Sequence, residues 1–308
     1  AIQNHSSIEN NYIRDGFWAY NNGQELTNPG LFATFIISID DVTAIALKGV
    51  TAGMSEKDRL ALVGRNIDEY KKTVKKETYQ DVIIRPFFEG NKYYLFVTET
   101  YKDVRLVGAP PSSIGNFGKD SDNWMWPRHT GDFSMFRIYA AKNNKPTAGY
   151  AADNVPYKPK RALNMSLDGV KEGDFTMVFG FPGRTTEYLH SSAVEQIMNV
   201  SDPAKIAIRE KALQVLNSFM RKDEQIKIQY AAKYATIENA YKKWKGEVQG
   251  LRSSDAVGKK KELESNFEKL VLANPGMNLE YADLLKKLKQ AYADIEPYGY
   301  ARDYYSEI

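Results

Sequence analysis

The segment from Asp122 to Phe133 holds the densest group of chemically active side chains in the chain. It contains two indoles, a guanidinium, an imidazole and two carboxylates, on Trp124, Trp126, Arg128, His129, Asp122 and Asp132. Pro127 restricts Trp126 to extended conformations and Gly131 permits a sharp turn, so we expect Asp132 at the mouth of a strand over residues 133–139. A carboxylate held there could orient a catalytic imidazole.

A structural interpretation explains the same segment. Buried indoles commonly pack on proline or arginine, so Trp126 and Pro127 could plug a core while Asp132 caps a turn. Arg128 is expected to stack on an indole and brace the loop. From the chemistry of the residues alone, the two interpretations stand equal.

The other residue types restrict what this chain can catalyse. Its three histidines are His5, His129 and His190; the first and third lie beside serine pairs, where surface or capping roles are expected, and His129 lies too near Asp132 in sequence to pair with it comfortably. No Gly-x-Ser-x-Gly turn occurs, and Phe117 occupies the nucleophile position of the similar stretch 115–118. With no cysteine and no histidine pair at ligand spacing, we expect no metal and no cofactor.

Composition indicates a globular chain large enough for two domains. The 308 residues are 43% hydrophobic, and the net charge of +3 arises from abundant charges of both signs. Nothing in this balance requires nucleic acid or an anionic membrane as a partner. No apolar run approaches the about 18 residues of a membrane span, and the opening residues lack the layout of a signal peptide.

The pattern changes near residue 200. Before it, short β-branched and aromatic runs predict strands at 31–42, 82–88, 93–100, 104–107, 133–139 and 175–181. Gly90 and Asn91 suit a tight hairpin, and helical spacing predicts a helix over 55–76.

After residue 200 the sequence pattern predicts helices. Asp202 followed by Pro203 is typical of a helix start, with the carboxylate accepting orphan amides. Apolar stripes then predict packing faces at Ile208, Ala212, Val215 and Phe219, at Leu263, Phe267 and Leu270, and at Tyr281, Leu284, Leu288 and Ile295. The stretch 274–276 separates the last two stripes.

Four stretches, in order, resemble motifs of the S46 family of bacterial dipeptidyl-peptidases. They are Asn-Trp-Met-Trp-Pro-Arg-His-Thr-Gly-Asp-Phe at 123–133, with 1–7, 15–19 and 180–185. The resemblance implies an α+β fold, with a chymotrypsin-like antiparallel β-barrel portion over 1–190 and the first part of an inserted α-helical cap domain over 191–308. It also implies a serine exopeptidase that releases dipeptides from the free N-terminus of peptides.

Of the catalytic triad, the resemblance carries only the aspartate to this chain, at Asp132. The family's histidine and serine motifs would lie before Ala1 and beyond Ile308, so the chain is expected to be an internal part of a longer enzyme and inactive alone. The resemblance further assigns recognition of the substrate's amino terminus to Asn123 and Trp124, and to Asn239 in the stretch 230–239. It implies a periplasmic or cell-surface location.

The alternative is a complete, non-catalytic peptide-binding module that uses Trp124, Trp126 and a helical surface as a groove. That hypothesis explains the missing nucleophile without a longer chain. Under either hypothesis the partners are peptides. A homodimer is compatible with the sequence, which determines neither the oligomeric state nor the side-chain preference at the cleavage site.

Overall fold

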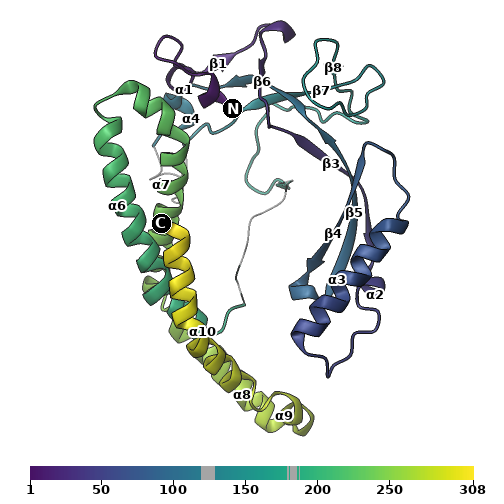
Figure 1. Ribbon diagram of the computed structural model, residues 1–308. Helices are drawn as coiled ribbons and strands as arrows, with labels where there is room; N and C mark the ends of the chain where they lie inside the picture. The colour runs from purple at the N-terminus through teal and green to yellow at the C-terminus, as the bar shows by residue number, and fades with distance from the viewer. Residues whose placement is uncertain (119–128, 179, 181–185, 187) are drawn as a thin grey trace. The chain divides into compact units, whose positions relative to one another are not determined.

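A computed structural model describes residues 1–118, 129–178, 180, 186 and 188–308. Its contacts divide the chain into two compact units, each assembled from three segments (Figure 1). The strand unit comprises Ala1–His5, Gly16–Pro110 and Phe133–Asn164. The helical unit comprises Ser6–Asp15, Pro111–Asp132 and Met165–Ile308. The domain boundary expected between residues 190 and 191 stays a prediction.

The strand unit is built from two antiparallel sheets. In the first, the order is β1-β6-β7-β8 with β2 also paired to β6, and in the second it is β3-β5-β4. The strands are β1 Phe17–Trp18, β2 Leu26–Thr27, β3 Ala33–Asp41, β4 Gln80–Phe87, β5 Lys92–Tyr101, β6 Asp103–Ala109, β7 Met135–Ala140 and β8 Val155–Pro156. Because only Lys102 separates β5 from β6, one extended run passes from the second sheet into the first (Figure 1).

Five of the six predicted strands are confirmed as β3, β4, β5, β6 and β7. The sixth, over 175–181, is wrong for the residues described, because 175–178 form no strand and Phe175 and Val178 are almost fully exposed. An extended segment becomes a strand only when a neighbour satisfies its amides and carbonyls. None of the strands described above is paired by hydrogen bonds with this segment.

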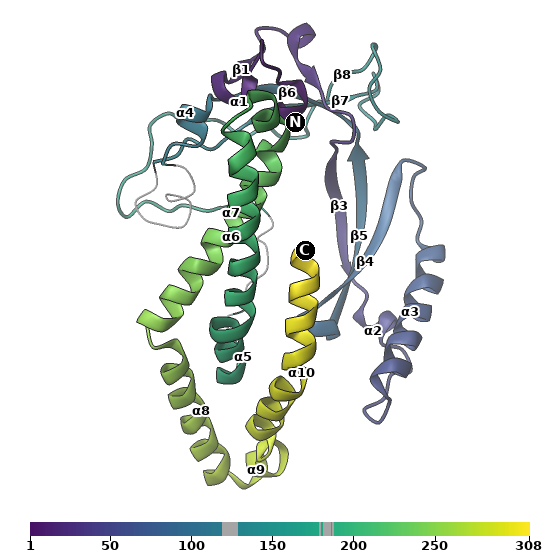
Figure 2. The same cartoon turned by 60° about the vertical axis from the view of Figure 1, so that its left-hand side comes forward.

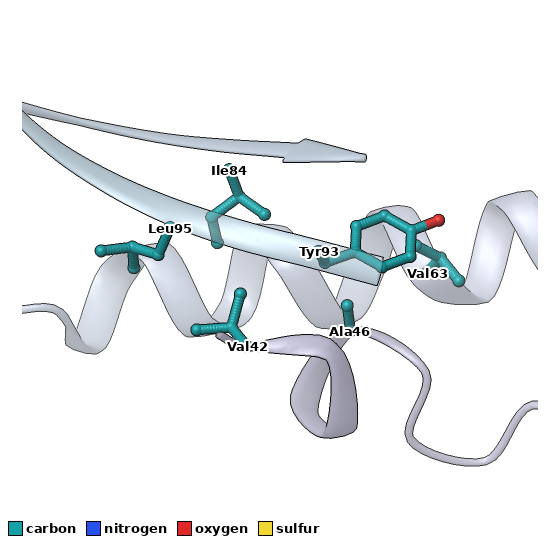
Figure 3. Packing of buried hydrophobic residues seen from close by; sticks show 6 residues of the cluster. All are labelled: Val42, Ala46, Val63, Ile84, Tyr93 and Leu95. Carbon is teal, nitrogen blue, oxygen red and sulfur yellow. The ribbon is translucent and has the colours of Figure 1, made fainter. Parts of the chain in front are cut away.

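The predicted helix over 55–76 is α3, Glu56–Thr73. Ser55 caps it by accepting a hydrogen bond of 3.2 Å from the Asp58 amide. Short α2, Thr43–Ala46, also contributes to the core beneath the β3-β5-β4 sheet. Figure 3 shows this core, in which helix and strand residues interdigitate: Val42, Ala46, Val63, Ile84, Tyr93 and Leu95.

The predicted hairpin joins β4 to β5, with Phe87 paired to Lys92. Its connecting residues form a 3₁₀ turn, Phe88–Gly90 (η3), in which Phe88, Glu89 and Gly90 all have positive φ. Two further 3₁₀ turns of this unit are η1, Ile2–His5, and η2, Asn22–Gln24. Left-handed backbone at Phe88 and Glu89 is costly for residues with a Cβ, so the sheet on both sides must impose it.

The helical unit contains a long antiparallel pair, α6 and α7, joined by a short turn (Figure 2). Its helices are α1 Tyr12–Asp15, α4 Ser112–Gly115, α5 Ser191–Gln196, α6 Asp202–Met220, α7 Glu224–Ser253, α8 Ala256–Ala273, α9 Pro275–Tyr281 and α10 Leu284–Glu307. Asp223 caps α7 and Asn274 caps α9, each accepting hydrogen bonds from two backbone amides. The break predicted at 274–276 is therefore confirmed as the start of α9.

The expected role of Asp202 as a helix cap is wrong. A π-helical turn, Ile197–Ser201 (η5), connects α5 directly to α6, so the amides at Asp202 are not those of a free helix end. Asp202 is instead 3% exposed, and among the described residues its Oδ2 has no hydrogen-bond partner.

Two of the predicted packing stripes are only partly buried. On α6 the buried apolar residue is Leu213, whereas Val215 and Phe219 are about half exposed at 48% and 57%. On α8, Leu263 and Leu270 are more than 60% exposed and Val271 is buried, although Phe267 packs edge-on against Tyr281. Among the described residues, no helix is both long and apolar enough to span a membrane.

Candidate functional site

The two residues before Asp132 contact α4 and the residues that follow it, within the helical unit. The Gly131 amide donates to the Ile114 carbonyl at 3.0 Å, and Thr130 Oγ1 donates to the Phe117 carbonyl at 2.5 Å. A Cβ on Gly131 would lie 2.8 Å from the Ile114 Cγ2 atom, which is closer than carbon atoms normally approach. Only a residue without a Cβ fits this close to α4, so Gly131 allows the close approach. It thereby determines the position of the next residue, Asp132.

The segment Ser6–Asp15 supports the same region. Asn11 is 4% exposed, and its Nδ2 donates to Glu224 Oε1 at 2.9 Å. Its Oδ1 accepts from the Arg14 amide at 3.1 Å, so one buried side chain closes the turn of α1 and binds the first residue of α7. Ser6 Oγ accepts from the Ile13 amide at 3.2 Å and holds the other end of the turn.

The third wall of the site is the first half of α7. Glu224, Ile228, Ala231, Ala235 and Asn239 recur every three or four positions and therefore share one helical face, and Tyr234, three residues after Ala231, lies beside them. The end of α6 contributes Asn217 and Arg221, whose side chains are joined by a hydrogen bond of 3.2 Å.

These walls enclose a pocket of about 950 Å³ that lies wholly within the helical unit. Asp132 and Asn239 both line it, although the sequence separates them by more than a hundred residues. Amide and charged groups from α4, α6 and α7 surround them, namely Asn116, Asn217, Arg221, Glu224, Lys227 and Glu238. The volume lies at the upper end of the roughly 300 to 1,000 Å³ typical of small-ligand sites.

The lining groups favour a small charged ligand. Side-chain carbonyls, carboxylates and the Tyr234 ring are the groups that bind an ammonium, and Asn239 offers such a carbonyl. Two of the cations here are paired with carboxylates: Arg14 binds Asp15 at 2.7 Å, and Lys227 binds Glu224 at 3.3 Å. Within the described ranges no cluster of three potential metal ligands occurs.

His190 is held in place as a structural residue. It is the N-cap of α5: its Nδ1 accepts from the Ser192 amide at 3.1 Å, and its Nε2 lies 3.6 Å from Glu264. The neighbouring hydroxyl of Ser191 donates to Glu264 Oε2 at 2.7 Å rather than to the imidazole. The predicted capping role is confirmed, with the correction that the imidazole is buried.

His5 and His129 differ in their surroundings. His5 Nε2 lies 2.9 Å from the Thr27 carbonyl, within the strand unit. His129 is exposed.

Two of the predicted substrate-binding residues, Asn123 and Trp124, lie outside the described residues. The catalytic role predicted for Asp132 and the binding role predicted for Asn239 stay predictions. Sequence reasoning missed Asn11, Glu224 and Arg221, which shape the pocket. The helical spacing from Glu224 to Asn239 was the signal that could have found Glu224.

Comparisons with known proteins cover the whole chain. Residues 1–308 match the family model described as Peptidase S46. An Asp/Glu-specific dipeptidyl-peptidase of Flavobacterium psychrophilum is 56% identical over 308 residues, which are all of this chain and 43% of that protein. A dipeptidyl-peptidase 7 of Capnocytophaga gingivalis is 40% identical over 289 residues, 94% of this chain and 40% of that protein.

The fold of the chain is similar to that of a solved structure. The crystal structure of Porphyromonas endodontalis DPP11 in complex with the dipeptide Arg-Glu matches with a TM-score of 0.84 and 36% identity. The match covers 99% of this chain and 44% of that one. The chain thus spans less than half the length of the relatives it matches, and the mixed architecture of antiparallel sheets followed by helices is that of the solved relative.

Proposed function

The chain belongs to the peptidase S46 family, and we propose that it forms part of a serine exopeptidase that releases dipeptides from the free N-terminus of peptides. The observation that carries the proposal is the shared pocket of Asp132 and Asn239. The resemblance to the family implies different roles for the two residues, one in catalysis and one in recognition of the substrate amine. A dipeptidyl-peptidase needs both roles within one cavity.

The geometry of the substrate supports this arrangement. The scissile carbonyl lies two residues from the amino terminus, and two extended residues span at most about 7 Å. A pocket of about 950 Å³ has room for that length together with its side chains. Anchoring the ammonium at a fixed distance from the nucleophile is what makes the second peptide bond the one that reacts.

In this proposal Asp132 accepts a hydrogen bond from a catalytic histidine and keeps the imidazole in the tautomer that can deprotonate a serine. The histidine and the serine belong to parts of the protein outside these 308 residues, so the chain alone should be inactive. Asn123, Trp124 and Asn239 bind the substrate's ammonium. The strand unit would contribute to a chymotrypsin-like barrel, with 1–190 in the peptidase domain and 191–308 in the helical cap.

The comparisons support a preference for acidic side chains. The relatives named Asp/Glu-specific include those at 56% and 53% identity, whereas the relatives named dipeptidyl-peptidase 7 are at 39% to 40%. We therefore infer cleavage after an aspartate or glutamate in the second position. A periplasmic or cell-surface location and a homodimeric state are parts of the same proposal.

The test uses the complete protein that contains these residues. Mass spectrometry follows peptides that carry Glu or Leu in the second position, each with a free or an acetylated N-terminus. We expect dipeptide release from the free Glu peptide, at least tenfold slower release from the Leu peptide, and none from the acetylated forms. Release of single residues, or equal cleavage of acetylated peptides, would refute the exopeptidase proposal, whereas a Leu preference would refute only the acidic specificity.

A further inference from the structure

Arg209 on α6 contacts the part of α7 that carries Asn239. Its Nη1 donates to the main-chain carbonyls of Thr236 and Ile237, at 3.2 Å and 3.4 Å. These carbonyls lie three and two residues before Asn239, respectively, within the same helical turn. Arg209 lines no part of the pocket, and its side chain is 19% exposed.

Side-chain hydrogen bonds to carbonyls inside a helix are unusual, because each carbonyl normally accepts from the amide four residues later. A carbonyl oxygen has a second lone pair, so the guanidinium adds a bond at this turn. Thr236 adds another local bond, since its Oγ1 donates to the Ala232 carbonyl at 2.9 Å. Side-chain bonds of this kind are a known cause of local helix bending, so they act on the turn of α7 that also bears Glu238 and Asn239.

The other side of the guanidinium is held by α10. Arg209 Nε and Nη2 donate to the two oxygens of Glu307 at 2.5 Å and 3.1 Å, which is a bidentate pair. Its guanidinium carbon also lies 4.7 Å from the centre of the Trp244 ring on α7. These contacts fix the planar guanidinium on three sides. A displacement of α7 would break its hydrogen bonds, and the guanidinium therefore opposes such a displacement.

We propose that Arg209 is a positioning residue that fixes the turn of α7 carrying Asn239 and thereby sets the affinity of the pocket for a substrate's free amino terminus. This inference rests on the proposed role of Asn239 in binding the substrate's ammonium. Arg209 itself touches no substrate. A displacement of about 1 Å at a binding group can cost about a hundredfold in rate, so loss of the guanidinium should be measurable at the pocket.

The experiment measures inhibition of the complete protein by the dipeptide Arg-Glu and by its N-acetyl derivative. Arg209→Met keeps the length and apolar packing of the side chain but removes its hydrogen bonds. We expect its inhibition constant for the free dipeptide to rise by about tenfold, while the constant for the acetylated dipeptide changes by less than twofold. Arg209→Lys keeps the positive charge but not the paired N–H groups of the guanidinium. Its inhibition constant for the free dipeptide should lie between those of Arg209→Met and the parent.

Lys205→Met is the matched control. Lys205 lies one turn earlier on α6, contacts the same Trp244 ring at 5.1 Å and binds α10 through Asp303 at 3.4 Å. Its ammonium binds the carboxylates of Asp202 and Asp303, so its loss tests the general attachment of α6 to α10. An equal change in both variants would mean that Arg209 has no specific effect on α7, and would overturn the proposal.

The decisive comparison is the double variant with Asn239→Ala. If Arg209 acts through Asn239, Arg209→Met should change the inhibition constant by less than twofold in the Asn239→Ala background. Independent, multiplying effects would overturn the inference while leaving the proposed function intact. If Asn239→Ala alone leaves discrimination between free and acetylated dipeptides unchanged, the assigned role of Asn239 fails, and with it the basis of this proposal.

Discussion

The side-chain amide of Asn11 donates a 2.9 Å hydrogen bond to Glu224 Oε1. This contact joins the N-terminal segment of the helical unit to the first residue of α7, at the wall of the candidate site. Asn11 is 4% exposed, so the bond is shielded from water on the asparagine side. A short segment that is remote in sequence thus helps to fix the end of the helix that carries Asn239.

Asn11→Asp should destabilise the protein more than Asn11→Ala at neutral pH. The aspartate keeps the acceptor for the Arg14 amide but places a carboxylate against Glu224. Alanine removes both the bond to Glu224 and the acceptor for the Arg14 amide, but it adds no like charge. We expect a loss of about 1 to 2 kcal/mol for alanine and a larger loss for aspartate. Thermal unfolding at pH 7 gives the order, and a more stable aspartate variant would contradict the contact.

Gly131→Ala should destabilise the loop that carries Asp132. The new methyl carbon would lie 2.8 Å from the Ile114 Cγ2 atom, so either the loop or Ile114 must move. Overpacking of this kind costs about 1 to 3 kcal/mol. The melting temperature and the activity of the complete protein should both fall.

Gly246→Ala is the matched control for that substitution. Gly246 lies inside α7, and apart from its chain neighbours and the backbone of the surrounding helix no atom lies within 4 Å of the position of an added Cβ. Alanine there should stabilise the helix by up to about 1 kcal/mol because it restricts the unfolded chain. If both glycine variants shift the melting temperature in the same direction, the close approach of Gly131 to Ile114 is not the cause of the shift in Gly131→Ala.

The stability of the helical unit should depend on pH through Asp202. Burial, opposed by Lys205 and Lys243 and reinforced by Glu247 and Asp303, raises the pKa of Asp202 to about 6. The folded state therefore binds this proton more tightly than the unfolded chain, whose aspartates have a pKa of about 3.9. The contribution of Asp202 to stability is full below about pH 4 and declines as the pH rises to about 6.

Asp202→Asn removes this dependence. Relative to the variant, the parent should lose stability between pH 4 and pH 6, by up to about 3 kcal/mol for a shift of two pKa units. The measurement is the difference in melting temperature between parent and variant across that range. A difference that stays constant with pH would mean that Asp202 does not titrate there.

In the strand unit, Arg137→Met should lower the free energy of unfolding more than Glu25→Gln does. The Glu25 side chain is 1% exposed and accepts hydrogen bonds from Arg137 at 2.7 Å and Tyr139 at 2.8 Å, whereas the Arg137 side chain is 43% exposed. Arg137→Met leaves a buried carboxylate without its countercharge, which should lower the free energy of unfolding by about 3 kcal/mol. Glu25→Gln leaves Arg137 unpaired, but water can hydrate the exposed guanidinium, so the loss should be about 1 to 2 kcal/mol. Denaturant unfolding gives both values, and the reverse order would contradict this account.

The sequence predicted the parts of the fold that short segments determine. β-Branched and aromatic runs located β3 to β7, and helical spacing with Ser55 as cap located α3. Helix ends after residue 200 were predicted less well. The pair Asp202-Pro203 is compatible with a helix start, but packing of the preceding turn continues the helix through a π-turn and buries the carboxylate.

Long-range contacts explain the remaining differences. No local pattern pairs Asn11 with Glu224, or Arg209 with Glu307, because such partners are chosen by how distant helices pack. Conversely, the apolar residues at 175–178 favour a strand, but a strand forms only where a neighbour exists. Asp132 and Asn239 came from a resemblance to known motifs, and the structure adds that they line one pocket.

The most direct test of the central claim is the turnover of the complete protein with Asp132→Asn. If Asp132 orients the catalytic imidazole, turnover should fall by about 10⁴-fold, while the inhibition constant of the dipeptide Arg-Glu stays within about threefold of the parent value. Turnover within tenfold of the parent would remove Asp132 from the mechanism and contradict the assignment of this pocket to a serine dipeptidyl-peptidase.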